Sequence, residues 1–308
     1  MIIKSADDKT KRLRLLEAIE QSQTITKKQK EWCGKARVKL QRGIHGEKNA
    51  AHYIDSFCRD SKGRVVLHDL RLEVDDEVAQ IDHLMINRLF EFFLFETKNF
   101  DGNLTINELG EFSVKYANER EYGIESPIEQ SKRHERILKK ALEQLGIVGR
   151  IGINPVFHHL VLLHPKAVIS RPPLKKFDTS CIIKADLFPA WYTKFADKIP
   201  VTEAFIGLIN IRRKDTIIQW GEMLKQIHKP EDLLRLPDFM QPQKTVKNTS
   251  DFHSEKLKKE TDLIDRCAKC NRVLAENVIA FCKNNEKRFG GLLYCYDHQR
   301  GLGKYSNN

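Results

Sequence analysis

The sequence predicts an α/β body that follows a helical N-terminal arm and precedes a small cysteine-rich module. Helical and extended periodicities alternate between residues 43 and 240. Gln, Pro, Lys, Asn, Thr and Ser dominate residues 241–260, a composition typical of a linker. Four of the seven cysteines lie in the last 42 residues. We therefore expect an arm at 1–42, a body at 43–240, a linker at 241–260 and a module at 261–308.

Most of the excess positive charge lies at the N-terminus. The 308-residue chain has a formal net charge of +11, and residues 1–46 hold twelve Lys and Arg against five Asp and Glu, a net charge of +7. Such a basic flank suits a polyanionic partner, nucleic acid first and an anionic membrane surface second. A solvated helical face explains the same charge about equally well.

The composition argues against several classes of protein. With 41% hydrophobic and 31% charged residues, the balance is that of a soluble globular protein. No apolar run reaches the ~20 residues that a membrane helix needs, and the first residues lack the apolar core of a secretory signal. An odd number of cysteines in a chain of this length favours reduced thiols over a disulfide framework. We expect a cytoplasmic protein without a membrane span.

The helices of the arm and body can be placed by their apolar periodicity. One or two helices are expected over residues 10–39, until Gly43 and Gly46 interrupt them. An amphipathic helix then begins at Glu47. Ser126 and Pro127 provide the cap and first turn of another helix, which runs to about residue 145. Two further helices are expected around 187–195 and 202–211.

The strands are recognised by alternating or continuous apolar runs. They are expected at 65–72, 78–87, 89–98, 104–106, 112–114, 156–163 and 181–183, with tight turns near 87–88 and 101–102.

Asp82 and Glu96 stand on consecutive predicted strands with thirteen residues between them. Two paired strands and a tight turn occupy this length, so the carboxylates can lie side by side at strand ends. Such an oxygen-rich pair suits Mg²⁺ or Mn²⁺. Lys98 points the same way as Glu96, where it can orient an attacking water. An ordinary ion pair at a strand end is the alternative, and it is the commoner case for an isolated Asp and Glu-x-Lys.

Short motifs surround these residues in a characteristic order. They are Gly46-Glu47, His68-Asp69-Leu70, Ala79-Gln80-Ile81-Asp82-His83, Phe95-Glu96-Thr97-Lys98-Asn99 followed by Gly102, and Ser126-Pro127-x-x-Gln130. In this order and spacing, residues 43–165 resemble the nuclease-related domain, or NERD domain, of the PD-(D/E)XK nuclease superfamily. The resemblance implies a restriction-endonuclease-like core, a mixed central sheet flanked by helices. Ile81 stands where the superfamily has its leading proline, a departure usual for NERD domains.

The same resemblance implies a set of active-site residues. They are Glu47, Asp82, Glu96, Lys98 and Gln130. Asp82 and Glu96 would bind Mg²⁺ or Mn²⁺, with the carbonyl of Thr97 as a third ligand. Lys98 would position or activate a water, and Glu47 and Gln130 would hold metal-bound water or substrate.

The histidines near these motifs are expected to be structural. Strand alternation turns His83 away from the face of Asp82, which favours packing or hydrogen bonding over ligation. His158, His159 and His164 are expected to be satisfied within the core.

Two ligand pairs mark the C-terminal module. Cys267-x-x-Cys270 and Cys295-x-x-His298 are separated by twenty-four residues, and their spacing suits a closed tetrahedral Zn²⁺ site. Cys282 lies between them and is an alternative ligand. A module of under fifty residues buries too little core to be stable alone, so a structural metal would contribute. The segment 281–295 resembles a zinc ribbon, whereas chance clustering of thiols is the alternative.

These observations predict a Mg²⁺-dependent nuclease that hydrolyses phosphodiester bonds, with DNA as the favoured nucleic acid, acting in DNA processing or defence. The competing hypothesis is a non-catalytic nucleic-acid-binding protein with the same fold. A membrane-surface or signalling adaptor has only the basic arm in its favour. Motifs for a Ser or Cys nucleophile or for a nucleotide-binding P-loop do not occur in the sequence.

Overall fold

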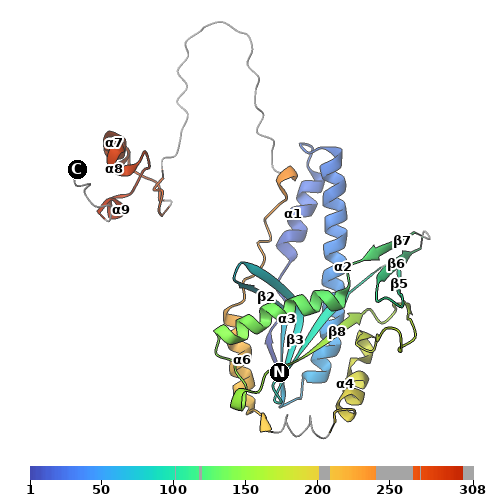
Figure 1. The fold of residues 1–308 in the computed structure, drawn as a ribbon. Helices are drawn as coiled ribbons and strands as arrows, with labels where there is room; N and C mark the ends of the chain where they lie inside the picture. The colour runs from blue at the N-terminus through green and yellow to red at the C-terminus, as the bar shows by residue number, and fades with distance from the viewer. Residues whose placement is uncertain (101, 118–119, 201–208, 241–265, 271, 301–308) are drawn as a thin grey trace. The chain divides into compact units, whose positions relative to one another are not determined.

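The computed structural model describes residues 1–100, 102–117, 120–200, 209–240, 266–270 and 272–300 (Figure 1). The chain divides into two compact units, Met1–Gln243 and Lys244–Asn308. The expected linker at 241–260 lies outside the described residues, as does most of the helix expected at 202–211. Among the helices described, none is both long enough and apolar enough to cross a membrane.

A six-stranded mixed sheet forms the centre of the larger unit. Its order is β1 (Ile2–Lys4), β2 (Arg64–Val74), β3 (Glu77–Asn87), β4 (Glu91–Lys98), β8 (Val156–Leu163) and β10 (Ile182–Lys184). The strands β2, β3 and β4 pair antiparallel in sequence order. Parallel pairs add β1 beside β2, β8 beside β4 and β10 beside β8. The long strands expected between 65 and 98, and the strand expected at 156–163, are confirmed. The short strand β1 was not expected.

Helices cover both faces of this sheet (Figure 1). They are α2 (Lys27–Cys58), α3 (Pro127–Gln144), α4 (Phe188–Asp197) and α6 (Lys214–Gln226). Side chains of α3 and α6, including Leu138 and Trp220, form one core with the sheet. Side chains of α2 and α4, including Ile54 and Phe188, form the other. The mixed sheet between two helical layers confirms the predicted fold class.

The central residues of β4 form a continuous apolar run because both faces of the strand are buried. Phe92 and Leu94 point into the core under α3 and α6, whereas Phe93 and Phe95 point into the core under α2 and α4. Successive side chains on a strand alternate between faces. A strand at the centre of a sheet that is covered on both faces therefore lacks the alternation of polar and apolar residues that marks a half-exposed strand.

A second, smaller sheet extends the body. Its order is β7 (Glu121–Ile124), β6 (Phe112–Tyr116), β5 (Gly102–Ile106) and β9 (Ile169–Ser170). The hairpin expected at 104–106 and 112–114 corresponds to β5 and β6, while β7 and β9 were not expected. Val161 and Leu163 of β8 share a hydrophobic cluster with this sheet, so it packs next to the end of β8.

The helix α2 runs without a break from Lys27 to Cys58, so the predicted start of a new helix at Glu47 is wrong. A glycine inside a helix costs only about 1 kcal/mol, which packing can offset. Gly46 is buried, and a Cβ on it would lie 2.6 Å from the Cβ of Asn99. This glycine lets α2 approach the end of β4 closely rather than ending the helix.

The arm packs onto the body. Its first residues form β1, which pairs in parallel with β2, and α1 (Thr10–Gln21) lies along the first half of α2 (Figure 1). The buried ammonium of Lys4 donates hydrogen bonds to the side chain of Asp7 and to the carbonyls of His68 and Asp69, at 2.8, 3.1 and 3.0 Å. Part of the arm's positive charge therefore has a structural role.

The described part of the smaller unit consists of short helices. They are α7 (Glu276–Asn284), α8 (Glu286–Phe289) and α9 (Tyr296–Arg300). An isolated bridge joins Arg266 to Val273. The buried hydrophobic cluster holds Cys267, Leu274 and Cys295, so the cysteines themselves make up much of this small core.

Alanine substitutions at Gly43 and Gly46, two of the three glycines of α2, should have opposite effects. Gly46→Ala should lower the free energy of unfolding by about 1–3 kcal/mol, because its Cβ overpacks the contact with Asn99. Gly43→Ala should raise it by up to about 1 kcal/mol, because a Cβ there meets nothing closer than 3.8 Å. Urea unfolding followed by tryptophan fluorescence measures both, since all three tryptophans lie in the larger unit. If both substitutions changed the free energy of unfolding by the same amount, the close contact of Asn99 with a continuous helix at Gly46 would be contradicted.

Candidate functional site

The pairing of β3 with β4 brings Asp82 and Glu96 to adjacent positions. His83 pairs with Phe95, and the next step of this antiparallel ladder sets Asp82 opposite Glu96. The backbone N–H of Thr97 donates a hydrogen bond of 2.7 Å to the Oδ2 atom of Asp82. The structure thus places the two acids side by side near the end of β4.

The ammonium of Lys98 joins β4 to the start of α3. Its Nζ atom donates to Glu96 Oε1 at 2.7 Å and to Gln130 Oε1 at 2.9 Å. Gln130 lies in the first turn of α3 because Ser126 caps that helix, accepting a hydrogen bond from the N–H of Glu129 at 3.3 Å. Local helix-capping chemistry therefore positions a side chain of the site.

Glu47 reaches the site from α2 and is paired with a residue that the sequence did not suggest. The Nζ atom of Lys9 lies 3.0 Å from Glu47 Oε2 and 3.4 Å from Asp69 Oδ2. Asp69 is buried in β2 and has a positive φ of 54°, a conformation that few side chains adopt. Its carboxylate also accepts hydrogen bonds from the N–H of Asp7 and from the Gln80 side chain. Asp69 thus anchors the segment that carries Lys9.

A further residue, His134, lies one helical turn beyond Gln130. Its Nδ1 atom is 3.8 Å from Glu96 Oε2. Burial, together with the charges of Arg133 and Lys98, lowers the pKa of His134 to about 4, so the ring is neutral at pH 7. The i, i+4 spacing from Gln130 could have indicated this position.

The acid cluster, defined here as Glu47, Asp82 and Glu96, consists of three carboxyl groups whose ionised forms are destabilised by burial. Burial, with the charges of Glu96 and Glu47, raises the pKa of Asp82 well above its usual range. Burial also raises the pKa of Glu96, although Lys98 opposes it, and that of Glu47, although Lys9 opposes it. Two lysines therefore leave the three carboxylates incompletely neutralised.

A cavity of about 350 Å³ adjoins the acid cluster. Glu47 and Asp82 line it, and the segment Ser5–Thr10, including Lys9, forms another part of its wall. The N-terminal arm thus contributes directly to the site.

The histidines form hydrogen-bonded networks. The Nδ1 atoms of His68 and His83 are 2.7 Å apart, and His68 Nε2 lies 2.9 Å from Asp55 Oδ1. His83 Nε2 lies 3.2 Å from the hydroxyl of Thr97. Burial lowers the pKa of His83 well below its usual range, as expected of a neutral structural histidine. This chain of side chains ends at the hydroxyl of Thr97, the residue whose backbone N–H donates to Asp82.

The other histidines contact core or surface side chains. The ring nitrogens of His159 lie 2.8 Å from Ser131 Oγ and 2.7 Å from Glu135 Oε2. His158 packs on the ring of Phe93 at 4.5 Å. His164 stacks on His45, with ring centroids 6.0 Å apart.

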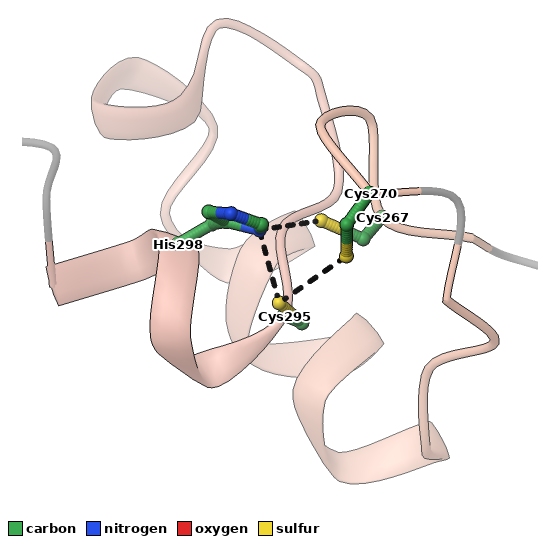
Figure 2. Close-up of side chains that lie close together, drawn as sticks. All are labelled: Cys267, Cys270, Cys295 and His298. Atoms are coloured by element: carbon green, nitrogen blue, oxygen red, sulfur yellow. Dashed lines mark hydrogen bonds between the residues drawn. The ribbon is translucent and has the colours of Figure 1, made fainter.

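The Cys/His cluster of the smaller unit comprises Cys267, Cys270, Cys295 and His298, whose side chains point toward one another in Figure 2. Their ligand atoms all lie within 4.8 Å of one another, a spacing at which the four side chains could hold a metal ion. The Sγ atoms of Cys270 and Cys295 are 3.8 Å apart. Bonds of about 2.3 Å from a tetrahedral zinc ion would separate two sulfurs by about 3.8 Å.

The Cys267 thiol is suited to binding a metal as the thiolate. Burial opposes ionisation, but hydrogen bonds from the backbone N–H groups of Cys295, Lys269 and Cys270, and from the ring of His298, lower the pKa of Cys267 to about 5. A thiolate is the form that binds a metal ion.

Cys282 lies outside this cluster. It is buried, and its Sγ atom accepts hydrogen bonds from the N–H of Tyr294 at 3.4 Å and from Gln299 Nε2 at 3.3 Å. Those contacts give Cys282 a packing role next to the cluster.

Comparison with known proteins identifies one family. Residues 42–164 match the family model of the nuclease-related domain, NERD, which confirms the resemblance seen over 43–165. No curated protein and no solved structure matches the chain. The matched segment includes the acid cluster, Lys98 and Gln130, whereas Lys9 and the Cys/His cluster lie outside it.

The variant Asp82→Asn should be more stable than the wild type at pH 7.5, because it removes a charge that burial, Glu96 and Glu47 disfavour. The folded carboxyl has a higher pKa than the unfolded one, so the wild type loses stability as pH rises from about 4, the ordinary carboxyl pKa, to the raised value. The advantage of the variant should grow over that window and then level off. Urea unfolding between pH 4 and 8 measures it.

The exposed residue Asp60 provides a matched control. Asp60→Asn should shift stability little at any pH in this range. A variant Asp82→Asn less stable than the wild type at pH 7.5 would mean that the charge-dependent hydrogen bond from Thr97 outweighs the repulsion.

Proposed function

We propose that the nuclease-related domain of this chain hydrolyses phosphodiester bonds in nucleic acid with the help of Mg²⁺ or Mn²⁺. The observation that carries the proposal is the acid cluster on β3, β4 and α2, next to a lysine fixed by Glu96 and Gln130. The family match over the same residues supports it. DNA is the favoured substrate, with a role in DNA processing or defence.

The residues present fit a hard divalent cation. Asp82 and Glu96 offer carboxylate oxygens, the donors that Mg²⁺ and Mn²⁺ prefer, and the carbonyl of Thr97 would add a third. Burial and neighbouring carboxylates raise the pKa values of both acids, so their ionised forms are destabilised, and a cation would stabilise them. When bound, such an ion lowers the pKa of a water and polarises the scissile phosphate.

The protein's own side chains then orient the reactants. Two of the three N–H bonds of the Lys98 ammonium are held by Glu96 and Gln130, which fix its position, and the third can orient a water or a phosphate oxygen. The Gln130 oxygen accepts from Lys98, so its NH₂ group can donate to substrate. Lys9 holds Glu47 at the cavity wall.

A non-catalytic nucleic-acid-binding protein is the second candidate function. It would account for the basic charge of the chain but not for three carboxylates gathered beside a lysine, a grouping that weakens polyanion binding. The acid cluster therefore favours the enzyme.

The smaller unit has a separate metal role in this proposal. Cys267, Cys270, Cys295 and His298 would bind Zn²⁺ as a structural ion, with Cys282 outside the ligand set. The cluster itself occupies much of the unit's small core, so the binding free energy of the ion would stabilise the fold.

Substitution of the active-site residues tests the nuclease. The variants Asp82→Ala, Glu96→Ala and Lys98→Ala should each lower the rate of Mg²⁺- or Mn²⁺-dependent cleavage of labelled DNA or RNA at least about 100-fold, as loss of a catalytic group does. Lys194→Ala, an exposed lysine on α4, should cleave at the wild-type rate. A wild type that binds but never cleaves, with either metal, would favour the non-catalytic function; cleavage by all three variants would refute the site.

Metal analysis tests the second site. The purified protein should contain about one zinc per chain, and Cys267→Ser or Cys295→Ser should lose it and make residues beyond 260 sensitive to protease. Cys282→Ser should keep the zinc, because this thiol contacts Tyr294 and Gln299 instead. A zinc-free wild type with a protease-resistant smaller unit would exclude a structural zinc.

A further inference from the structure

We propose that a basic groove leading away from Lys98 binds a single-stranded segment of nucleic acid, with unpaired bases stacked on Phe100 and Tyr116. The inference rests on the proposed function for the chemistry at Lys98, and it adds the class of substrate. It depends on the shape, charge and aromatic lining of the groove.

Two adjoining hollows form the groove. The first, of about 690 Å³, begins at Thr97 and Lys98 and runs along α2. The second, of about 580 Å³, lies beside β5, β6 and the end of β8. Asn99, Phe100 and Tyr116 line both hollows, so the two lie side by side. A polymer bound along the groove would reach the site at Lys98.

The groove is positively charged. Lys35, Lys39 and Arg42 lie on one face of α2 at i, i+4 and i+7, are exposed, and line the first hollow. The exposed residues Lys115 and Lys166 line the second. Of the described residues that line either hollow, none is Asp or Glu. The charge of the groove therefore suits a row of phosphates.

The aromatic lining selects unpaired bases. Phe100 and Tyr116 are half-buried where the hollows meet, and the stacked rings of His45 and His164 line the second hollow. Inside a duplex, the faces of each base are covered by neighbouring bases. Aromatic side chains in a basic groove can stack with bases only when a strand is single or frayed.

The helix α2 forms one wall of the first hollow, to which Gly34 and Gly43 contribute. The Asn99 amide donates a hydrogen bond of 3.0 Å to the carbonyl of Arg42, which ties this wall to the end of β4. Lys35 and Lys39 precede the matched nuclease-related segment, which begins at residue 42. Part of the groove is thus supplied by the N-terminal arm of this chain.

Fluorescence anisotropy on the full chain tests the groove. The protein carries Asp82→Asn to prevent cleavage, and the probes are a fluorescein-labelled mixed-sequence DNA 20-mer, its duplex and the matching RNA strand, without added Mg²⁺. The single strands should bind more tightly than the duplex. Tyr116→Leu or Phe100→Leu should weaken single-strand binding by about 5- to 100-fold, the usual effect of losing one stacked base.

Matched variants separate stacking from packing and charge. Tyr116→Phe keeps the ring and should bind like its parent. Lys35→Ala with Lys39→Ala should reduce the slope of log affinity against log salt by about 0.7 per lost phosphate contact on a single strand, whereas Lys194→Ala should leave it unchanged. Melting temperatures verify that each variant is folded. If Tyr116→Leu or Phe100→Leu fails to fold, the double variant Lys35→Ala with Lys39→Ala still tests the groove.

Unchanged single-strand affinity in folded ring variants, or an unchanged salt slope in the lysine pair, would overturn the groove. Duplex binding as tight as single-strand binding would overturn it as well. Cleavage by the wild type separates the two proposals: cleavage without ring-dependent binding refutes the groove alone, and ring-dependent binding without cleavage leaves the groove and refutes the nuclease.

Discussion

The antiparallel pairing of β3 with β4 is the constraint on which the site depends. It sets Asp82 opposite Glu96, and the backbone of Thr97 fixes the first of these carboxylates. Because β4 is buried on both faces, this register cannot slip by one residue without turning phenylalanines out of one core and into the other. The helices that bury those faces also bring Glu47 and Gln130 to the same place. Packing and site assembly are thus achieved by the same contacts.

The site carries a destabilising charge that its neighbours only partly offset. Lys98 pairs with Glu96 and Lys9 with Glu47, yet burial still raises the pKa values of the acids. The positive φ of Asp69 adds backbone strain close by. Such features are common where a protein holds groups ready for a ligand. A bound divalent cation would relieve the repulsion, which links the stability of the larger unit to its proposed function.

Periodicity and local chemistry predicted most of the body. The long strands and α3 follow from apolar runs and from the Ser126-Pro127 start, and the Cys/His cluster follows from two short spacings whose geometry is largely local. The break expected at Gly43 and Gly46 is wrong, because the close approach of Asn99 to α2 is visible only in three dimensions. Lys9 was missed for a similar reason: its partners Glu47 and Asp69 lie 38 and 60 residues away along the chain. The positive charge of the N-terminal arm suggested a solvent-exposed element. The first residues of the arm instead form β1, which pairs with β2 and belongs to the central sheet.

Metal-dependent thermal stability tests the central claim most directly, that the acid cluster on β3, β4 and α2 binds a divalent cation. Tryptophan fluorescence reports melting of the larger unit alone, because all three tryptophans lie there. Increasing Mn²⁺ or Mg²⁺ should raise the melting temperature of the wild type progressively, as binding to the folded state requires. The same titration should leave the melting temperature of Asp82→Asn nearly constant. Equal responses in the two proteins, or none in either, would contradict a metal site at Asp82.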